Sequence, residues 1–345
     1  MQRLRVIVRR YPFLLTTGLL LAGNASAHHS QAPYDMTTEV VIEGTIVDLE
    51  WRNPHIAMTL EVVGQNGETV LQEVEVASVS ELRALGVDES AIPLGSRVAL
   101  QAHPGRRGPR TRVFGLGLTT TGGMRIPLHP FAGFANRSEV SIQATSLAGR
   151  WAPSGDGLTE VFGAFMNWPY TDAARASLGD AVNRPGESLG VCADYPPPLL
   201  SIFPDLREIE IDDASVVMHF EAQGQNLERL VRMNVAEHPA DVEPSLLGHS
   251  IGRWEGETLV VDTVAFTPHP HGAFAWVGSG PDKHLVERFT LADDRLHLRY
   301  DFTMEDPESL TQPGTLSMAW DYRPDLEPSG VACDPEIAER LLHEE

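Results

Sequence analysis

Alternating apolar and polar residues between positions 39 and 77 constrain the fold of this chain more than any other feature. The alternation recurs at 41–49, 56–63 and 70–76. A period of two places successive side chains on opposite faces of a strand, so these segments predict three strands in a meander. Asn66-Gly67, between the second and the third segment, predicts the hairpin turn that joins them.

The residues that follow predict a small barrel. Ser78 and Glu81 have the spacing of a capping box at the start of a short helix, which Gly86 is expected to end. Strands are predicted again at 97–102 and 112–119. Three strands, a helix and two more strands are the order of elements in an OB-like barrel, which we assign to residues 28–130.

A second β-rich unit is predicted at 147–345, after a linker at 131–146 in a stretch with weak periodicity. A helix is expected at 169–182, and strands are expected at 206–212, 215–221, 227–235, 257–264, 284–291, 295–304 and 314–322. The protein is therefore predicted to be mainly β, with a small OB-like barrel followed by a larger antiparallel barrel or sandwich. A lipocalin-like barrel fits this pattern.

The first 27 residues have the pattern of a secretory signal peptide. Four arginines between positions 3 and 10 precede an apolar stretch, and Ala25-Ser26-Ala27 is a typical cleavage site. The apolar stretch is short for a bilayer span, and no stop-transfer segment follows it. We therefore expect a periplasmic or secreted protein without an integral membrane segment after cleavage.

Charge and cysteine content narrow the expected partners. The formal net charge is −22, which argues against nucleic acid and anionic lipid surfaces. Cys192 and Cys333 are the only cysteines and do not form a CxxC pair, so in an oxidising compartment they predict a disulfide. The sequence does not determine the oligomeric state.

Several motifs of the first unit occur together and in order. They are His28-His29-Ser30, Tyr34-Asp35, Glu43-Gly44-Thr45-Ile46 and Trp51-Arg52-Asn53-Pro54-His55. This set resembles the secreted bacterial family called domain of unknown function 6152, over about residues 27–125. The second half carries the block GHSIGRWEGETLVVDT at 248–263 and resembles an uncharacterised secreted β-rich bacterial module. The resemblance implies a β-rich envelope protein, and neither half brings a function with it.

Histidines of the first unit suggest a metal site. Cleavage after Ala27 would leave His28 at the N-terminus, where its amine and its imidazole can bind one metal ion together. His29 or His55 would supply a third nitrogen, and His103 and His129 are further candidates. Amine and imidazole nitrogens suit Cu(II), so copper is the one cofactor that the sequence suggests. In the alternative interpretation, the terminus is frayed and Asn53-Pro54-His55 is a structural turn.

The second unit offers two other sets of candidates. His249, His284 and Glu287 are candidates for an acid/base site, although His284 and Glu287 are three residues apart and would point to opposite faces of a strand. In the alternative interpretation, Trp151 or Trp254 plugs a barrel end, and Glu287 lies at the surface or rim. The candidate ligand-binding residues are Trp254, Glu255, Phe274 and Trp276, the last two on a predicted loop at 266–282.

Four functional hypotheses follow. In the first, the second unit is a module that binds a small, unidentified ligand. In the second, the protein binds copper, or uses it in redox chemistry, through His28 and His55. In the third, it is an enzyme, which requires His249, His284 and Glu287 to converge in one cleft. In the fourth, it is a structural or assembly factor. The GxSxG pattern at 248–252 precedes a strand-like block instead of a helix, which argues against a serine hydrolase.

Overall fold

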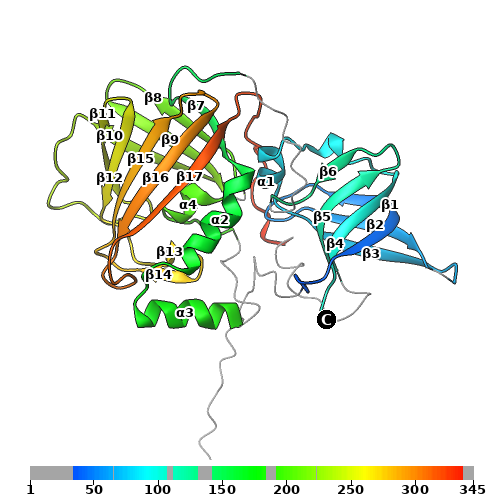
Figure 1. Ribbon diagram of the computed structural model, residues 1–345. Helices are drawn as coiled ribbons and strands as arrows, with labels where there is room; N and C mark the ends of the chain where they lie inside the picture. Colours follow the sequence, from blue (N-terminus) through cyan, green and yellow to red (C-terminus); the bar gives the residue numbers. More distant parts are fainter. Residues whose placement is uncertain are drawn as a thin grey trace, which may run out of the picture.

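The computed structural model describes residues 34–64, 66–106, 112–130, 142–183, 192–222 and 224–336. Within these residues the chain forms a six-stranded sheet and a closed barrel of nine strands, which lie side by side (Figure 1). No helix of this part of the chain is long and apolar enough to cross a membrane. The predicted signal peptide, His28, His29 and residues 131–141 of the predicted linker lie outside the described residues.

The six-stranded sheet forms the first unit. Its strands are β1 (Val40–Glu50), β2 (Ala57–Val63), β3 (Thr69–Glu75), β4 (Arg97–His103), β5 (Val113–Thr120) and β6 (Arg125–Pro127). They are ordered β3-β2-β1-β4-β5-β6, and β3 also pairs with β5 in parallel, so that β1 to β5 close on themselves. This is the OB-like barrel that the sequence predicts.

Local signals place the short elements of this barrel where they were expected. The Ser78 hydroxyl accepts a hydrogen bond from the backbone N–H of Glu81 at 3.0 Å, and the Glu81 carboxylate accepts one from the N–H of Ser78 at 2.8 Å. This capping box begins α1 (Val79–Ala84), and a one-turn helix η1 (Glu89–Ala91) follows. Gly67 lies in the β2–β3 turn with a φ of 82°, a value that glycine adopts without strain.

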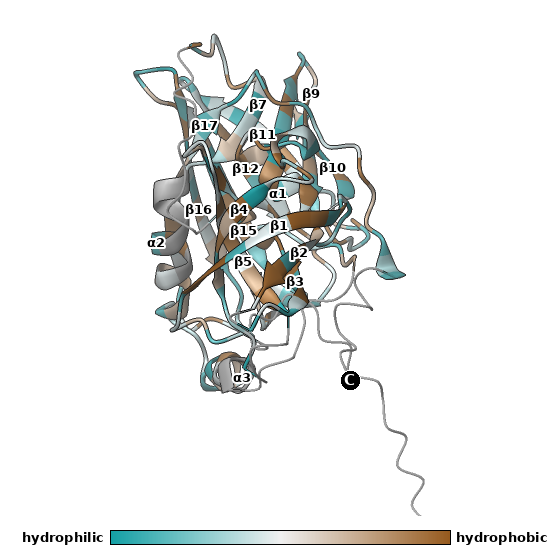
Figure 2. Ribbon diagram, turned by 90° about the vertical axis from the view of Figure 1, so that its right-hand side faces the viewer, coloured by the Kyte–Doolittle hydropathy of each residue, from teal (hydrophilic) through white to brown (hydrophobic). Residues whose placement is uncertain are grey.

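Apolar side chains fill the inside of the OB-like barrel. Met58 and Leu60 of β2 are buried, while the residues between and beyond them are at least partly exposed. Figure 2 shows the corresponding change between hydrophobic and hydrophilic residues along the strands. The period-two pattern of the sequence thus corresponds to one face turned to the core.

The nine-stranded barrel forms the second unit. Its strands, in hydrogen-bonded order, are β10 (Gln225–Met233), β11 (His249–Glu255), β12 (Thr258–Val264), β15 (His284–Leu291), β16 (His297–Glu305), β17 (Gly314–Tyr322), β7 (Gly149–Pro153), β8 (Arg207–Ile211) and β9 (Ser215–Ala222). All pairs are antiparallel except β10 with β11, which are parallel. The predicted antiparallel barrel is thus confirmed, with the β10–β11 pair as an exception, because residues 234–248 carry the chain back along the barrel before β11 begins.

Three helices and a hairpin accompany this barrel: α2 (Gly155–Met166), α3 (Asp172–Asn183), α4 (Leu199–Ile202), and β13 (His269–Phe274) paired with β14 (Val277–Ser279). Helix α2 packs against β17, which pairs with β7 only through 320–322. The sequence did not predict α2, whose three glycines lower its helix propensity. The hairpin lies where a loop was predicted at 266–282.

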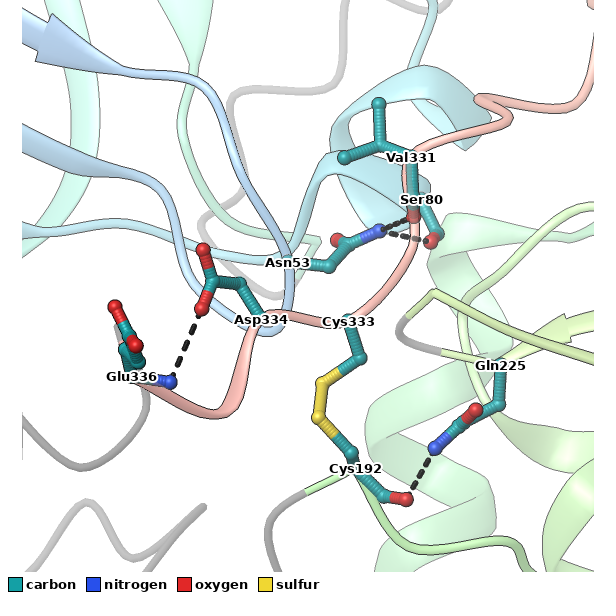
Figure 3. The surroundings of a disulfide bond; sticks show 8 residues. All are labelled: Asn53, Ser80, Cys192, Gln225, Val331, Cys333, Asp334 and Glu336. Atoms are coloured by element: carbon teal, nitrogen blue, oxygen red, sulfur yellow. Dashed lines mark hydrogen bonds between the residues drawn. A yellow bond between two sulfur atoms is a disulfide. The ribbon is translucent and has the colours of Figure 1, made fainter.

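The C-terminal segment joins the two units. Cys192 and Cys333 form the predicted disulfide, with their Cα atoms 5.7 Å apart (Figure 3). The side chain of Asn53 donates a hydrogen bond to the carbonyl of Val331 at 2.6 Å and accepts one from the N–H of Val79 at 2.8 Å. The motif that follows β1 is therefore bound to the segment that the disulfide holds.

Candidate functional site

Three histidines of the OB-like barrel lie around Phe114. His103 of β4 is opposite Phe114 in the register of β4 with β5, and the ring of His129 contacts Phe114 edge-on at 4.9 Å. On the other side of β5, where β3 pairs with it in parallel, Glu75 is opposite Phe114. The Nδ1 atom of His55 lies 3.6 Å from the Glu75 carboxylate. Residues that are far apart in the sequence thus form one histidine cluster, which we define as His55, His103 and His129.

Backbone carbonyls fix the tautomer of two of these rings. The Nδ1 atom of His55 lies 3.1 Å from the carbonyl oxygen of Val76, and that of His103 lies 2.7 Å from the carbonyl oxygen of Thr38. Because a carbonyl oxygen only accepts, each Nδ1 carries a proton, and Nε2 is the nitrogen of each ring that could bind a metal. Metal-binding histidines are commonly held in this way by their other ring nitrogen.

The three side chains of the histidine cluster are buried and have little contact with water. His55, His103 and His129 are 9%, 8% and 9% exposed. Burial, together with smaller effects of charge on His55 and His103, lowers the pKa of His129 to about 3. His129 is therefore neutral at pH 7, and the neutral imidazole is the form that binds metals.

The first described residue, Tyr34, lies beside the histidine cluster. Its hydroxyl donates a hydrogen bond of 2.5 Å to the carboxylate of Glu75. Its ring also lies 5.4 Å from that of Phe114, between centroids. The candidate ligand His55, next to Glu75, thus lies close to the point from which the chain leads back to His28.

The described side chains do not complete a metal site. No group of three or more histidine, cysteine, aspartate or glutamate side chains within the described ranges is arranged to hold a metal ion. His55 also makes the carbonyl contact that the structural-turn interpretation expects. A site built on the histidine cluster needs donors from elsewhere in the chain.

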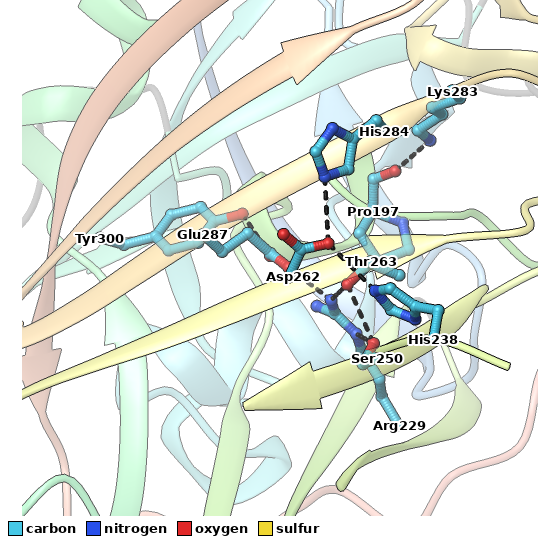
Figure 4. Close-up of polar contacts among 10 residues, drawn as sticks. All are labelled: Pro197, Arg229, His238, Ser250, Asp262, Thr263, Lys283, His284, Glu287 and Tyr300. Atoms are coloured by element: carbon cyan, nitrogen blue, oxygen red, sulfur yellow. Dashed lines mark hydrogen bonds and ion pairs between the residues drawn. The ribbon is translucent and has the colours of Figure 1, made fainter. Parts of the chain in front are cut away.

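The acid/base candidates of the second unit lie on opposite faces of the barrel wall (Figure 4). Glu287 points inward and is 0% exposed, where it forms an ion pair with Arg229 and accepts a hydrogen bond of 2.8 Å from Tyr300. His284 points outward, with Nε2 3.0 Å from the carboxylate of Asp262. The predicted opposition of His284 and Glu287 is confirmed. The placement of Glu287 at the surface is wrong, because Glu287 shares the buried face of β15.

The outward histidines form a chain of contacts. His238 lies with Nε2 3.1 Å from Asp262 and with Nδ1 2.8 Å from Nδ1 of His249. His238 thus uses a different ring nitrogen for each neighbour, so the groups do not converge on one point. Burial lowers the pKa of His249. The strands separate His249 and His284 from Glu287, so the three residues do not meet in one cleft.

Two ligand-binding candidates lie at the end of β11. Of the two tryptophans predicted as the plug of a barrel end, Trp254 is 46% exposed and does not fill this role. The inward tryptophan is Trp151, which is fully buried. The carboxylate of Glu255 accepts hydrogen bonds of 2.7 Å from Arg253 and Arg288 on the surface.

The other two ligand-binding candidates belong to the hairpin. Phe274 is buried and stacks on Phe165 of α2, with 4.2 Å between ring centroids. Trp276 lies in the β13–β14 turn, with a φ of 64°. The hairpin follows the end of β12 that pairs with the start of β11, so it lies away from Trp254 and Glu255 at the other end of β11. The four residues do not form one site.

The sequence interpretation missed a group of buried polar residues inside the nine-stranded barrel. Arg207, Arg229 and Tyr300 occupy inward positions on three strands and are almost fully buried. A signal for Arg229 was present, since it shares strand parity with the apolar residues Leu227 and Val231.

Comparison with known proteins supports the resemblance of the first unit. Residues 18–114 match the family described as Family of unknown function (DUF6152). The matched range includes His28, His29, His55 and His103, and it ends before His129. No curated protein matches the chain.

Proposed function

We propose that the OB-like barrel and the N-terminus left by signal-peptide cleavage together bind a transition metal ion, with copper as the preferred metal. The observation that carries this proposal is the histidine cluster, in which backbone carbonyls hold the Nδ1 atoms of His55 and His103 and which lies beside the first described residue, Tyr34. Metal binding is favoured over the other hypotheses because it uses residues that lie close together.

The terminal residue supplies the donors that the histidine cluster lacks. His28 is six residues before Tyr34, and an extended chain of that length spans at most about 20 Å. Since Tyr34 contacts Glu75 next to His55, the amine and imidazole of His28 are within reach of the His55 ring. His28 would contribute two nitrogens and His55 a third, while His29, His103 and His129 are the other candidate ligands.

The donor set favours copper. All of the candidate ligands are nitrogen donors, and both cysteines are engaged in the disulfide. Imidazole and amine nitrogens bind Cu(II) more tightly than other first-row divalent ions, according to the Irving–Williams order. A bound copper ion would supply one-electron redox chemistry, or it would be carried as cargo.

The proposal places the protein outside the cytoplasm. The terminal amine of His28 exists only after cleavage at Ala27, so export is a condition of the function. The Cys192–Cys333 disulfide supports an oxidising compartment such as the periplasm, because structural disulfides persist there.

The test is a Cu(II) titration of the protein beginning at His28, in competition with a chromophoric chelator of known affinity. In a second form the amine of His28 is acetylated, which removes the terminal nitrogen donor and leaves every imidazole in place. The proposal expects one copper ion per chain, and an affinity that falls at least about tenfold, or 1.4 kcal/mol, on acetylation.

The His219→Gln variant is the matched control, because His219 is a partly exposed histidine on the outside of β9. It should bind copper as the wild type does. Equal affinity with and without the acetyl group, or no binding beyond that of the chelator, would remove the terminal site from consideration.

A further inference from the structure

Inside the nine-stranded barrel, most polar atoms around Arg229 and Glu287 have a hydrogen-bond partner. Arg229 donates from Nε to Ser250 at 3.1 Å and from Nη2 to Thr263 at 2.7 Å, and it is ion-paired with Glu287. Both carboxylate oxygens of Glu287 are used, since Tyr300 donates to the second at 2.8 Å. In this part of the network one positive charge faces one negative charge.

A second guanidinium, that of Arg207, forms no ion pair with a described carboxylate, although the charge of the buried Asp205 acts on it. Arg207 of β8 is 2% exposed, and its guanidinium carbon lies 4.3 Å from the ring centre of Trp320 on β17. Its Nη2 atom donates to the carbonyl oxygens of Phe203 at 2.6 Å and Asp205 at 3.1 Å. No described group accepts from Nε or Nη1 of Arg207, or from Nε1 of Trp320.

These donors are costly when they are left without an acceptor. A buried polar group without a hydrogen bond loses the solvation that it had in water, and native structures leave few such groups. Burial lowers the pKa of Arg207 to about 9, although charge on Asp205 and Tyr300 acts in the opposite direction. The guanidinium therefore lies where negative charge would be favourable.

The chemistry of these donors selects the ligand class. Arg207 and Trp320 offer only N–H donors at these atoms, so the complement is a group that only accepts hydrogen bonds. A carboxylate accepts through two oxygens and also supplies the negative charge that a water molecule lacks. Tyr300, which stacks on Trp320 at 4.9 Å between ring centroids, provides an aromatic wall beside the pair.

We propose that the interior of the nine-stranded barrel binds a small carboxylate, held by the guanidinium of Arg207 and the indole N–H of Trp320. This inference gives the small-ligand hypothesis a defined ligand class and moves it away from Trp254 and the hairpin. It is independent of the metal site, because none of its residues belongs to the OB-like barrel.

The test is the midpoint of thermal unfolding, Tm, measured with formate or acetate against chloride at equal ionic strength. The proposal expects a saturable rise in Tm of about 3 °C or more at a carboxylate concentration about tenfold above its dissociation constant. Chloride, which cannot bridge both donors, should give a smaller and non-saturating change.

Two variants distinguish a specific site from a general salt effect. Arg207→Met should abolish the carboxylate response, but it also removes the bonds to the Phe203 and Asp205 carbonyls and so puts folding at risk. Trp320→Phe keeps an aromatic ring under the guanidinium and removes the N–H together with part of the fused ring, so it should lower the Tm without ligand and weaken the apparent affinity several-fold. Arg253→Gln, on the exposed face of β11, is the control and should respond as the wild type does.

Either of two results would overturn the proposal. The first is that formate and acetate shift the wild-type Tm no more than chloride does. The second is that Trp320→Phe responds with unchanged affinity. In both cases ordered water would be the partner of these donors.

Discussion

Asn53 and Cys333 pair in a parallel β-bridge, with the backbone carbonyl of Asn53 accepting a hydrogen bond of 2.7 Å from the N–H of Asp334. The amide side chain of Asn53 is used as well, by Val79 on the side of the first barrel and by Val331 on the C-terminal segment. The Trp-Arg-Asn-Pro-His motif thus serves two purposes. Its asparagine fixes the C-terminal segment, and its histidine belongs to the histidine cluster.

Replacement of Asn53 by alanine should therefore destabilise the whole protein. It leaves the N–H of Val79 and the carbonyl of Val331 without their partner in a buried place, which costs about 2–4 kcal/mol. Urea unfolding followed by circular dichroism measures this difference. Asn226→Ala, on an exposed position of β10, is the control. A loss for Asn53→Ala no larger than for the control would contradict this role.

The disulfide should make a separate contribution. Cys192 and Cys333 are 141 residues apart, and closing a loop of that length stabilises a fold by about 4–5 kcal/mol in the chain-entropy model. The double variant Cys192→Ser/Cys333→Ser should lose most of this amount in urea unfolding, and a reducing agent should have the same effect on the wild type only. An unchanged unfolding midpoint in both experiments would show that the bond does not support the fold.

The buried pair of Arg229 and Glu287 should behave non-additively. Glu287→Gln or Arg229→Met alone leaves an uncompensated buried charge, and each should cost about 3–5 kcal/mol. The double variant Arg229→Met/Glu287→Gln removes both charges and should cost much less than the two losses together. The four free energies of unfolding form a double-mutant cycle. A coupling energy near zero would mean that the two charges do not depend on each other.

Acid should destabilise the hairpin through His271. Burial lowers the pKa of His271 from 6.5 to about 4, with a further contribution from charge on His269, and its Nδ1 accepts a hydrogen bond from the N–H of Trp276. Because the folded pKa is lower, the unfolded chain takes up this proton first as the pH falls below 6.5. Stability should then decrease between pH 6.5 and 4, by on the order of 2 kcal/mol after allowance for partial exposure, and level off below.

The variant His271→Asn checks this explanation. Asparagine keeps an acceptor for the Trp276 N–H but does not titrate, so the variant should lose less stability than the wild type over that pH range. His219→Asn is the control for the loss of a more exposed imidazole. Identical pH profiles of wild type and His271→Asn would assign the acid sensitivity to other groups.

Much of the fold could be predicted from local sequence patterns. The pairing of segments that are far apart in the sequence could not. The alternation around Ile46, the Asn66-Gly67 turn and the capping box at Ser78 depend on neighbours in the sequence, and each was found where predicted. The parallel pairing of β10 with β11 depends on the path of residues 234–248 around the barrel. No local pattern encodes that path.

The same limit applies to the sites. Strand parity correctly separated His284 from Glu287, but it could not tell which of the two faces was inside, because that depends on the closure of the barrel. Similarly, the order of His55, His103 and His129 in the sequence gives no indication that they lie around Phe114. Arg207 was missed because its stacking partner, Trp320, lies more than a hundred residues away.

The most direct test of the central claim is the electron paramagnetic resonance spectrum of one equivalent of Cu(II) bound to the protein that begins at His28. It asks whether the terminal residue and the OB-like barrel bind the same ion. The account predicts a single copper species whose nitrogen hyperfine pattern loses one coupled nitrogen in His55→Gln and is unchanged in His219→Gln. The same spectrum in His55→Gln as in the wild type would contradict it, since the metal would then be bound without the barrel.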